Sequence, residues 1–357
     1  MKHVAVLGGG PAGAYAAELL ARAGVRTTLL DEKLAWEKPC GGGLTYKAYS
    51  RYSFLAENGT PKQLVRRTCL RAGARNTADF ELDHPLLIYS RIELNGMLLN
   101  RAASAGAPIE KARVLGAERK SDGGWRIGTR TGTVEADFCV VAMGARNPLR
   151  DVGTSWSTGD TMSSLGYFVP ARQDHVDLEF YPAFEGYIWI FPRHDHLSVG
   201  IAGKGVAAGT LRKMLHGYMA EKGLPTSRET FFGHVIPSLM QVSWNRNRVA
   251  GDGWLAVGDA AGLVDPVTGE GLYYALRSAE MAAALVIADP GSAAGAYRNS
   301  MWREFGEDLE RGAYLSGRLF RGQLLGKGIS ETMVALTRRS PALRGVVQDL
   351  FAGTQSY

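Results

Sequence analysis

The chain of 357 residues is 45% hydrophobic, which is typical of a globular protein and enough for two joined domains with a large core. It has no run of 18 apolar residues, which excludes a spanning helix, and its three cysteines (Cys40, Cys69, Cys139) are too few and too scattered for a disulfide framework or a zinc site. The net charge of +6 suits an acidic partner, but no zinc-finger or RNA-binding signature accompanies it, so we expect no nucleic acid. Because an apolar segment starts at Val4, we also expect no signal peptide and a cytoplasmic protein.

The opening stretch predicts a dinucleotide-binding turn. Four apolar residues lead into a glycine-rich segment in the G-x-G-x-x-G register, and an alanine-rich helical pattern follows. The candidate cofactor-binding residues of this segment are Gly8, Gly10, Ala12 and Gly13. Such glycines allow a tight turn, a close approach of a pyrophosphate and close packing of the helix, whose N-terminal N–H groups then face the phosphates.

A second apolar strand, residues 27–30, ends in Asp31 and Glu32. A carboxylate at this point of the motif can accept hydrogen bonds from an adenosine ribose. The segment Lys38-Pro-Cys-Gly-Gly-Gly-Leu44 follows, in which consecutive glycines let backbone N–H groups come close to a flat ligand. A plain surface loop is the alternative, but a cysteine placed among glycines favours a binding site.

The next predicted helix begins at a capping box and has predicted strands before and after it. Strand-like runs to Tyr89 precede Ser90-Arg-Ile-Glu93, a capping box that opens a helix ending near Gly106. Arg91 opposes the helix dipole in the first turn, which is better tolerated if the arginine serves a phosphate; a solvent-facing arginine is equally common. Residues 112–136 are predicted to form hairpins, and a buried strand over 136–143, containing Cys139, closes on Gly144.

Residues 165–203 predict antiparallel strands at 166–171, 176–181, 186–192 and 197–202, followed by a helix over 208–222 and a strand near 230–235. Tyr187, Trp189 and Phe191 share one face of the third strand, and a ligand-facing aromatic wall is as consistent with this as a plain core. The histidines of Arg193-His-Asp-His196 look like part of an exposed turn, so we expect no metal.

A second strong signal spans residues 253–272. A predicted buried strand over 255–257 is followed directly by Gly258 and Asp259. Further on, Gly269-Glu-Gly271 precedes a long alanine-rich helix that ends at about Ile287. Asp259 can bind ribityl hydroxyls, and the start of the helix can place N–H groups at the N1–C2=O edge of a flavin. This motif and the opening one both suit one extended ligand, FAD.

The last 60 or so residues predict helices near 296–325 and 330–351. Between Arg311 and Arg344 there is a single acid, Glu331, and seven basic residues: Arg311, Arg318, Arg321, Lys327, Arg338, Arg339 and Arg344. A solvated helical surface is one interpretation of this excess, and contact with an anionic membrane surface is the other.

Taken together, these motifs resemble the flavoprotein geranylgeranyl reductases, within the wider fold of para-hydroxybenzoate hydroxylase. The resemblance spans nearly the whole chain and depends most on Lys38-Pro-Cys-Gly-Gly-Gly43 and Tyr187-Ile-Trp-Ile-Phe-Pro192. It implies non-covalent FAD, reduction of carbon–carbon double bonds in a prenyl chain, and NADPH or a reduced ferredoxin as electron donor. It also implies that Tyr187, Trp189, Phe191 and Pro192 line the substrate pocket.

The flavin would face Cys40, Gly41 and Gly42, which are the candidate catalytic residues. The thiol of Cys40 could donate a proton if it is neutral, or it could only shape the site. Hydroxylases of this fold usually carry an Asp-Gly pair after the strand near Val140–Gly144, which this chain lacks. Flavin halogenases carry a motif related to Tyr187–Pro192, so they remain an alternative.

We therefore expect an α/β protein with a Rossmann-like FAD-binding domain (residues 1–164 and 250–295), an inserted, mainly antiparallel substrate-binding sheet (165–249) and C-terminal helices (296–357). The expected function is reduction of an isoprenoid alkene on a prenyl lipid, a quinone tail or a prenyl diphosphate, with contact at the inner membrane surface as a further hypothesis. The alternatives are an FAD monooxygenase or halogenase acting on an aromatic compound, and a flavin-binding redox sensor.

Overall fold

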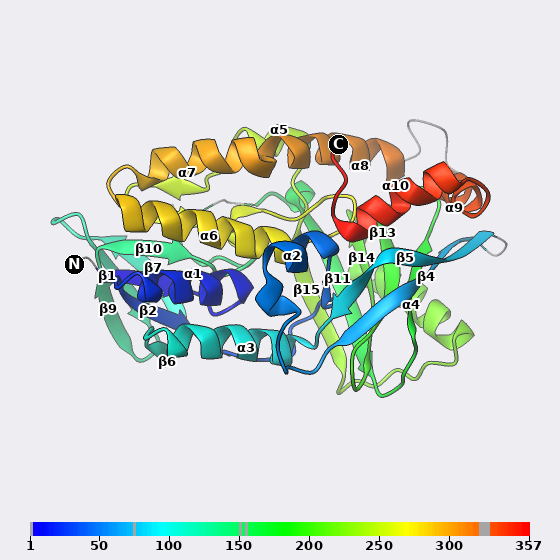
Figure 1. The fold of residues 1–357 in the computed structure, drawn as a ribbon, viewed down its shortest axis with the longest axis horizontal. Coiled ribbons are helices and arrows are strands. Elements are labelled where there is room, and N and C mark those ends of the chain that lie inside the picture. Colours follow the sequence, from blue (N-terminus) through cyan, green and yellow to red (C-terminus); the bar gives the residue numbers. More distant parts are fainter. Residues whose placement is uncertain (1–2, 74–75, 150–151, 154–155, 321–328) are drawn as a thin grey trace.

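The computed structural model describes residues 3–73, 76–149, 152–153, 156–320 and 329–357. One half of the molecule is a six-stranded sheet with helices on its faces, and the other half is an eight-stranded sheet (Figure 1). Helices from the C-terminal part of the chain run along one side of both halves (Figure 1). The expected α/β class is confirmed.

The six-stranded sheet has the order β16-β17-β10-β1-β2-β6. Its pairs are parallel except β16–β17. The strands are β1 (His3–Leu7), β2 (Arg26–Asp31), β6 (Ile109–Lys111), β10 (Phe138–Val141), β16 (Ala250–Gly251) and β17 (Trp254–Ala256). The central strands are almost entirely apolar because helices cover the sheet, and Cys139 is a buried core residue of β10, as expected.

Three helices surround this sheet: α1 (Pro11–Arg22), α3 (Arg91–Ser104) and α6 (Leu272–Ala288). Helix α1 packs against both others. Ser90 caps α3 by accepting a hydrogen bond from the backbone N of Glu93, as the sequence indicates. The expected hairpins form a small sheet of β7 (Val114–Arg119), β8 (Trp125–Thr129) and β9 (Gly132–Ala136).

The eight-stranded sheet has the order β15-β11-β14-β13-β12-β4-β5-β3. Its strands are β3 (Gly43–Leu44), β4 (Gln63–Ala72), β5 (Asn76–Ile88), β11 (Thr161–Val169), β12 (His175–Phe180), β13 (Gly186–Pro192), β14 (Leu197–Lys204) and β15 (Phe231–Pro237). The four expected antiparallel strands and β15 are present, but β12 also pairs in parallel with β4. Three strands of this sheet, β3, β4 and β5, come from residues 43–88, which we expect from the sequence to belong to the FAD-binding domain. The proposed domain boundaries remain a prediction.

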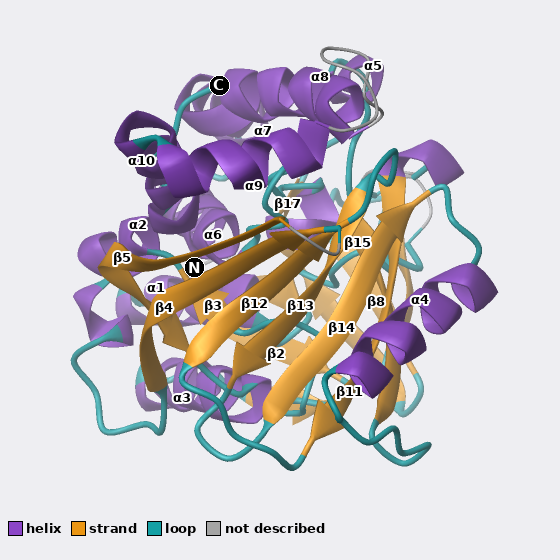
Figure 2. Cartoon of the chain, turned by 90° about the vertical axis from the view of Figure 1, so that its right-hand side faces the viewer, coloured by secondary structure: helices purple, strands orange, loops and turns teal. Residues whose placement is uncertain are grey.

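Helices cover the two faces of this sheet differently (Figure 2). Helix α4 (Ala208–Glu221) packs on β11 and β14, where Leu211 and Leu215 join Ile188 and Ile190 in an apolar cluster. Helix α9 (Ile329–Arg339) contacts β4 and β5, and α10 (Pro341–Ala352) contacts β5. The short helices are α2 (Tyr46–Arg51) and α5 (Gln241–Trp244).

The C-terminal helices differ from the expectation at two places. The predicted helix over 296–325 is α7 (Ala293–Met301), a π-helical turn (Trp302–Gly306) and α8 (Glu307–Phe320), and residues 321–325 lie outside the described ranges. The predicted helix over 330–351 is wrong, because it is two helices, α9 and α10, that meet at Ser340 and Pro341. Proline has no N–H and favours the first position of a new helix, and Ser340 accepts from the backbone N of Leu343.

Candidate active site

The glycine-rich turn after β1 has the shape that a bound pyrophosphate needs. Gly8 has φ +110°, and a Cβ there would lie 2.3 Å from the backbone oxygen of Ala142. A Cβ on Gly13 would lie 1.8 Å from the backbone oxygen of Gly8, whereas nothing lies within 4 Å of one on Gly10, at the N-cap of α1. Two glycines are thus required by close packing, and the third leaves open space in front of the helix N-terminus. These residues fit a dinucleotide.

Asp31 ends β2, and its carboxylate holds the turn in place. Its oxygens accept hydrogen bonds from the backbone N of Gly9 and of Lys33, each at 2.7 Å. A carboxylate has further lone pairs for ribose hydroxyls, so the expected ribose contact stays a prediction. Glu32 is exposed and pairs with Arg113 at 3.5 Å.

A cavity of about 330 Å³ connects the glycine-rich turn with the space under α9 and α10. Most of the predicted site residues line it: Gly10, Ala12, Cys40, Gly41, Gly42, Arg91, Gly144, Tyr187, Trp189, Phe191, Asp259, Gly269 and Gly271. The cavity lining does not include the remaining ones, which are Gly8, Gly13, Asp31, Glu32, Pro192 and Gly258. Segments far apart in the sequence therefore meet at one site.

The segment around Cys40 is fixed by its neighbours. Gly42 has φ +83°, and a Cβ there would lie 2.1 Å from the backbone oxygen of Tyr89. A Cβ on Gly41 would lie 3.0 Å from the ring of Phe191. The Sγ atom of Cys40 accepts from the backbone N of Gly42 at 3.3 Å. The glycines thus bring this backbone against the aromatic strand β13, and the sulfur is held by its own turn.

Arg193 is the residue that sequence reasoning misplaced. The segment Arg193–His196 was expected to be an exposed turn, but Arg193 is 1% exposed. Its guanidinium forms an ion pair with Glu37 and donates to the backbone oxygen of Cys40. Glu37 also accepts from the backbone N of Arg91 at 2.9 Å. One buried pair therefore joins the end of β13, the Cys40 segment and the start of α3.

The histidines next to it belong to a turn. His196 Nδ1 lies 2.7 Å from the carboxylate of Asp195. No group of three potential metal ligands occurs among the residues that the structure describes.

Charged and titratable side chains gather beside β15, where Lys38, His234 and Asp259 line the cavity. Lys38 Nζ lies 3.2 Å from Asp259 Oδ2. Burial alone would raise the pKa of Asp259, but the charge of Lys38 and its hydrogen bond outweigh burial and lower it. Burial and the positive charge of Lys38 together lower the pKa of His234 to about 4. Asp259 is thus ionised and His234 neutral at pH 7. Arg91 is buried and donates to Asn95 at 3.1 Å.

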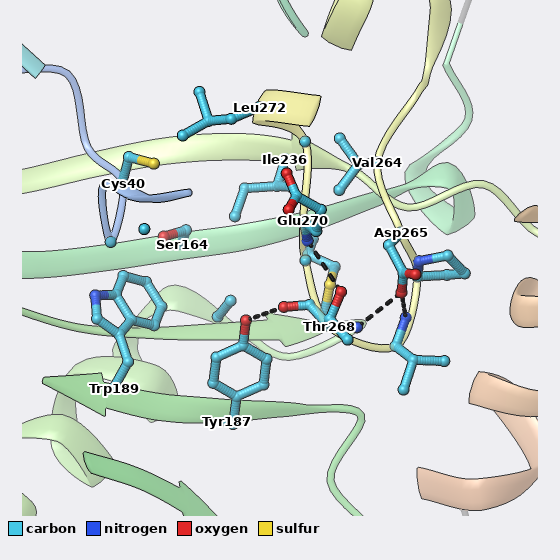
Figure 3. Close-up of a pocket in the computed structure, with 18 of the residues that line it drawn as sticks. Cys40, Ser164, Tyr187, Trp189, Ile236, Val264, Asp265, Thr268, Glu270 and Leu272 are labelled. Carbon is cyan, nitrogen blue, oxygen red and sulfur yellow. Dashed lines mark hydrogen bonds between the residues drawn. The ribbon is translucent and has the colours of Figure 1, made fainter. Parts of the chain in front are cut away.

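The aromatic side chains of β13 face the cavity together (Figure 3). Tyr187 and Trp189 lie side by side with ring centroids 6.2 Å apart, and the Tyr187 hydroxyl donates to the backbone oxygen of Thr268 at 2.6 Å. The aromatic-wall interpretation is thus favoured over a plain core. Pro192 ends the strand, paired with Leu197.

The far part of the cavity is apolar and was not predicted. Strands β4, β5 and β12 supply one side, and α9 and α10 supply the other. The lining side chains here include Leu70, Leu86, Leu178, Phe180, Val334, Val347, Leu350 and Phe351. The sequence predicts a helix in this region, but nothing in it shows that Val347 and Leu350 border a cavity.

Comparison with known proteins identifies the family. The sequence matches the FAD binding domain family over residues 1–199. It is 31% identical to digeranylgeranylglycerophospholipid reductase 2 of Methanothermobacter thermautotrophicus over 349 residues, covering 87% of this chain and 86% of the relative. The structure is similar to a geranylgeranyl bacteriochlorophyll reductase-like protein of Thermoplasma acidophilum, with a TM-score of 0.81 at 20% identity over 98% of this chain and 99% of the other.

A flavin-dependent brominase shares the fold with a TM-score of 0.74 at 15% identity, over 98% of this chain and 94% of the other. At such low identities the two structural likenesses show the fold alone. The family match and the sequence relative go further, because the family model covers more than half of the chain and the relative exceeds 30% identity over most of both chains. The chain belongs to the geranylgeranyl reductase family of FAD-dependent oxidoreductases.

Proposed function

We propose that this protein reduces carbon–carbon double bonds in an isoprenoid chain. The observation that carries the proposal is the continuity of the cavity, which joins the dinucleotide turn to an apolar space lined by residues of α9 and α10. The FAD cofactor, when bound, supplies the hydride for such a reduction. An isoprenoid has no polar groups along its chain, so it needs the aromatic and aliphatic walls that β13, β4 and α10 provide.

Different residues of this chain would bind different parts of the cofactor. The turn at Gly8–Gly13 and the N-terminus of α1 would bind the pyrophosphate, Asp31 the ribose, and Asp259 the ribityl hydroxyls. The N-terminus of α6, after Gly271, would bind the N1–C2=O edge. Arg91 would add positive charge near the phosphates. Cys40, Gly41 and Gly42 would form the wall next to the reacting face.

The substrate would be a prenyl lipid, a quinone tail or a prenyl diphosphate, and the electron donor NADPH or a reduced ferredoxin. Among the described residues, no helix is long and apolar enough to cross a bilayer. We propose that the outer surface of α9 and α10 contacts an anionic membrane, since it combines exposed apolar side chains (Met333, Leu336, Leu343, Val346) with Arg338 and Arg339. Arg321 and Lys327 lie outside the described residues.

The proposed function is tested by following flavin re-oxidation in the absence of oxygen. Protein loaded with FAD and reduced with dithionite is mixed with geranylgeranyl-type lipids, and flavin re-oxidation is followed together with product mass. A reductase re-oxidises without oxygen and yields a product two hydrogens heavier per turnover. The alternative, a monooxygenase or halogenase acting on an aromatic compound, requires oxygen and would show neither. Mass spectrometry of lipids that copurify with the protein would name the substrate class.

A further inference from the structure

The side chain of Glu270 enters the cavity from the loop before α6. Its Oε1 atom accepts a hydrogen bond from the backbone N of Tyr273 at 2.9 Å, which caps the helix and fixes the carboxyl group. Its Oε2 atom is buried and makes no hydrogen bond within the normal distance. Glu270 lines the same cavity as Cys40, Tyr187 and Trp189, and Figure 3 shows these residues around a common space. Glu270 thus lines the cavity with a carboxyl group that is fixed through Oε1, while its buried Oε2 atom makes no hydrogen bond among the described residues.

The charged and titratable groups around Glu270 favour its neutral form. Burial is the largest effect and raises the pKa of Glu270, and the nearby carboxylate of Asp265 raises it further. The backbone N–H of Tyr273 and the side chain of Thr45 act in the opposite direction but are outweighed. The other titratable neighbours are the phenols of Tyr187 and Tyr274, whose pKa values are both raised by burial. Tyr187 also interacts with Cys40, so the carboxyl and the thiol lie near one phenol.

We propose that Glu270 holds, on Oε2, the proton that is delivered to the substrate during alkene reduction. The inference rests on the proposed function. The π bond would break as one carbon receives a hydride with its electron pair, which bound FAD would supply once the electron donor has reduced it. The other carbon takes the proton of Glu270, and the O–H electron pair stays on the carboxylate, which regains a proton from solvent. An unactivated alkene gives no stable carbanion, so the acid must already be in place when the hydride arrives. Cys40, whose sulfur is held by Gly42, then shapes the site.

The first experiment is the anaerobic re-oxidation assay with Glu270→Gln. Glutamine keeps the shape and can still accept from Tyr273, but it cannot supply an acidic proton. General acid catalysis contributes about 10²–10⁴-fold, so we expect substrate-dependent re-oxidation to fall by at least about 100-fold at unchanged FAD affinity. Glu179→Gln is the control, because Glu179 is a buried carboxyl paired with Arg71 at 3.1 Å and does not line the cavity. Its rate should not change.

Two results would overturn the assignment. The first is a Glu270→Gln protein that re-oxidises within threefold of wild type. The second is a Cys40→Ala protein, with Cys40→Ser alongside it, that loses as much rate as Glu270→Gln, which would place the proton on the thiol. Added formate or acetate should restore part of the rate of Glu270→Ala, because a small acid can occupy the vacated space.

A second measurement needs neither FAD nor substrate. If Glu270 keeps its proton in the folded protein, folding binds a proton above the ordinary glutamate pKa, so its contribution to stability falls as pH rises through the raised pKa. The difference in unfolding free energy, Glu270→Gln minus wild type, should therefore increase with pH above about 4.3. A flat difference refutes a protonated Glu270 even if the assay succeeds. If wild type reduces no isoprenoid while the slope is present, the proposed function fails and the protonated carboxyl stands.

Discussion

Replacing Arg193 with methionine tests whether the buried ion pair holds the Cys40 segment. Methionine is similar in length but has no charge and no donor. The change removes the ion pair with Glu37, the hydrogen bond to the backbone oxygen of Cys40, and the contact of the guanidinium over the Phe168 ring at 5.2 Å. What remains is the carboxylate of Glu37, which is partly buried at 18% exposure, without its counter-charge.

The magnitude follows from what still binds each group. Breaking a buried ion pair by removing one partner costs about 3–5 kcal/mol. In the variant, Glu37 still accepts a hydrogen bond from the backbone N of Arg91 at 2.9 Å. The backbone oxygen of Cys40 still accepts one from the hydroxyl of Ser198 at 2.9 Å. We therefore expect the lower end, about 3 kcal/mol, out of a total stability that is typically about 5–15 kcal/mol.

The assay is urea unfolding of wild type, Arg193→Met, Glu37→Gln and the double variant, each also titrated with FAD. Glu37→Gln removes the charge that methionine leaves unpaired, so the double variant should be more stable than the sum of the single losses predicts. FAD affinity should fall in Arg193→Met because the Cys40 segment loosens. An Arg193→Met protein with an unchanged urea midpoint and full FAD binding would refute the reasoning.

Three further predictions concern Asp259, Gly42 and the outer surface of α9 and α10. Asp259→Ala should purify largely without yellow colour, because hydrogen bonds to a charged group contribute about 1.5–3 kcal/mol; retention of FAD at wild-type affinity in an absorbance titration would contradict the ribityl contact. Gly42→Ala should lower the thermal midpoint and weaken FAD binding, since its Cβ would lie 2.1 Å from the Tyr89 oxygen, whereas Gly209→Ala, where nothing lies within 4 Å, is the control in the same scan. Arg338→Gln with Arg339→Gln should weaken sedimentation with anionic liposomes by about 2 kcal/mol, or roughly 30-fold, with no effect on neutral liposomes; binding that ignores both lipid charge and salt would exclude the membrane contact.

The sequence was most informative where chemistry is encoded in neighbouring residues. The turn at Gly8–Gly13 and the capped start of α3 follow from local rules of backbone conformation and hydrogen bonding, so both could be predicted. Tyr187, Trp189 and Phe191 share one face of the sheet because side chains alternate between the two faces along a strand. In each case the residues that determine the structure lie within a few positions of one another.

Features that depend on distant partners could not be predicted. From the sequence, Arg193 looks like part of a polar turn. Its burial depends on the ion pair with Glu37, which comes from a distant part of the chain. The parallel pairing of β12 with β4 likewise joins segments that no local pattern connects. Glu270 was read only as the middle of a glycine motif, because its burial depends on how the loop folds over the cavity.

The division of the cavity wall has a consequence for how this enzyme family diversifies. The flavin side is made by sheet strands and glycine turns whose close packing tolerates few replacements. In the far part of the cavity, one side is made by α9 and α10, which belong to neither sheet. Substitutions at Val334, Val347 or Leu350 would therefore change the length or shape of the space for the proposed isoprenoid chain without altering the glycine-rich segments. If the proposed function holds, the C-terminal helices could change the accepted substrate length while the residues next to the cofactor stay the same.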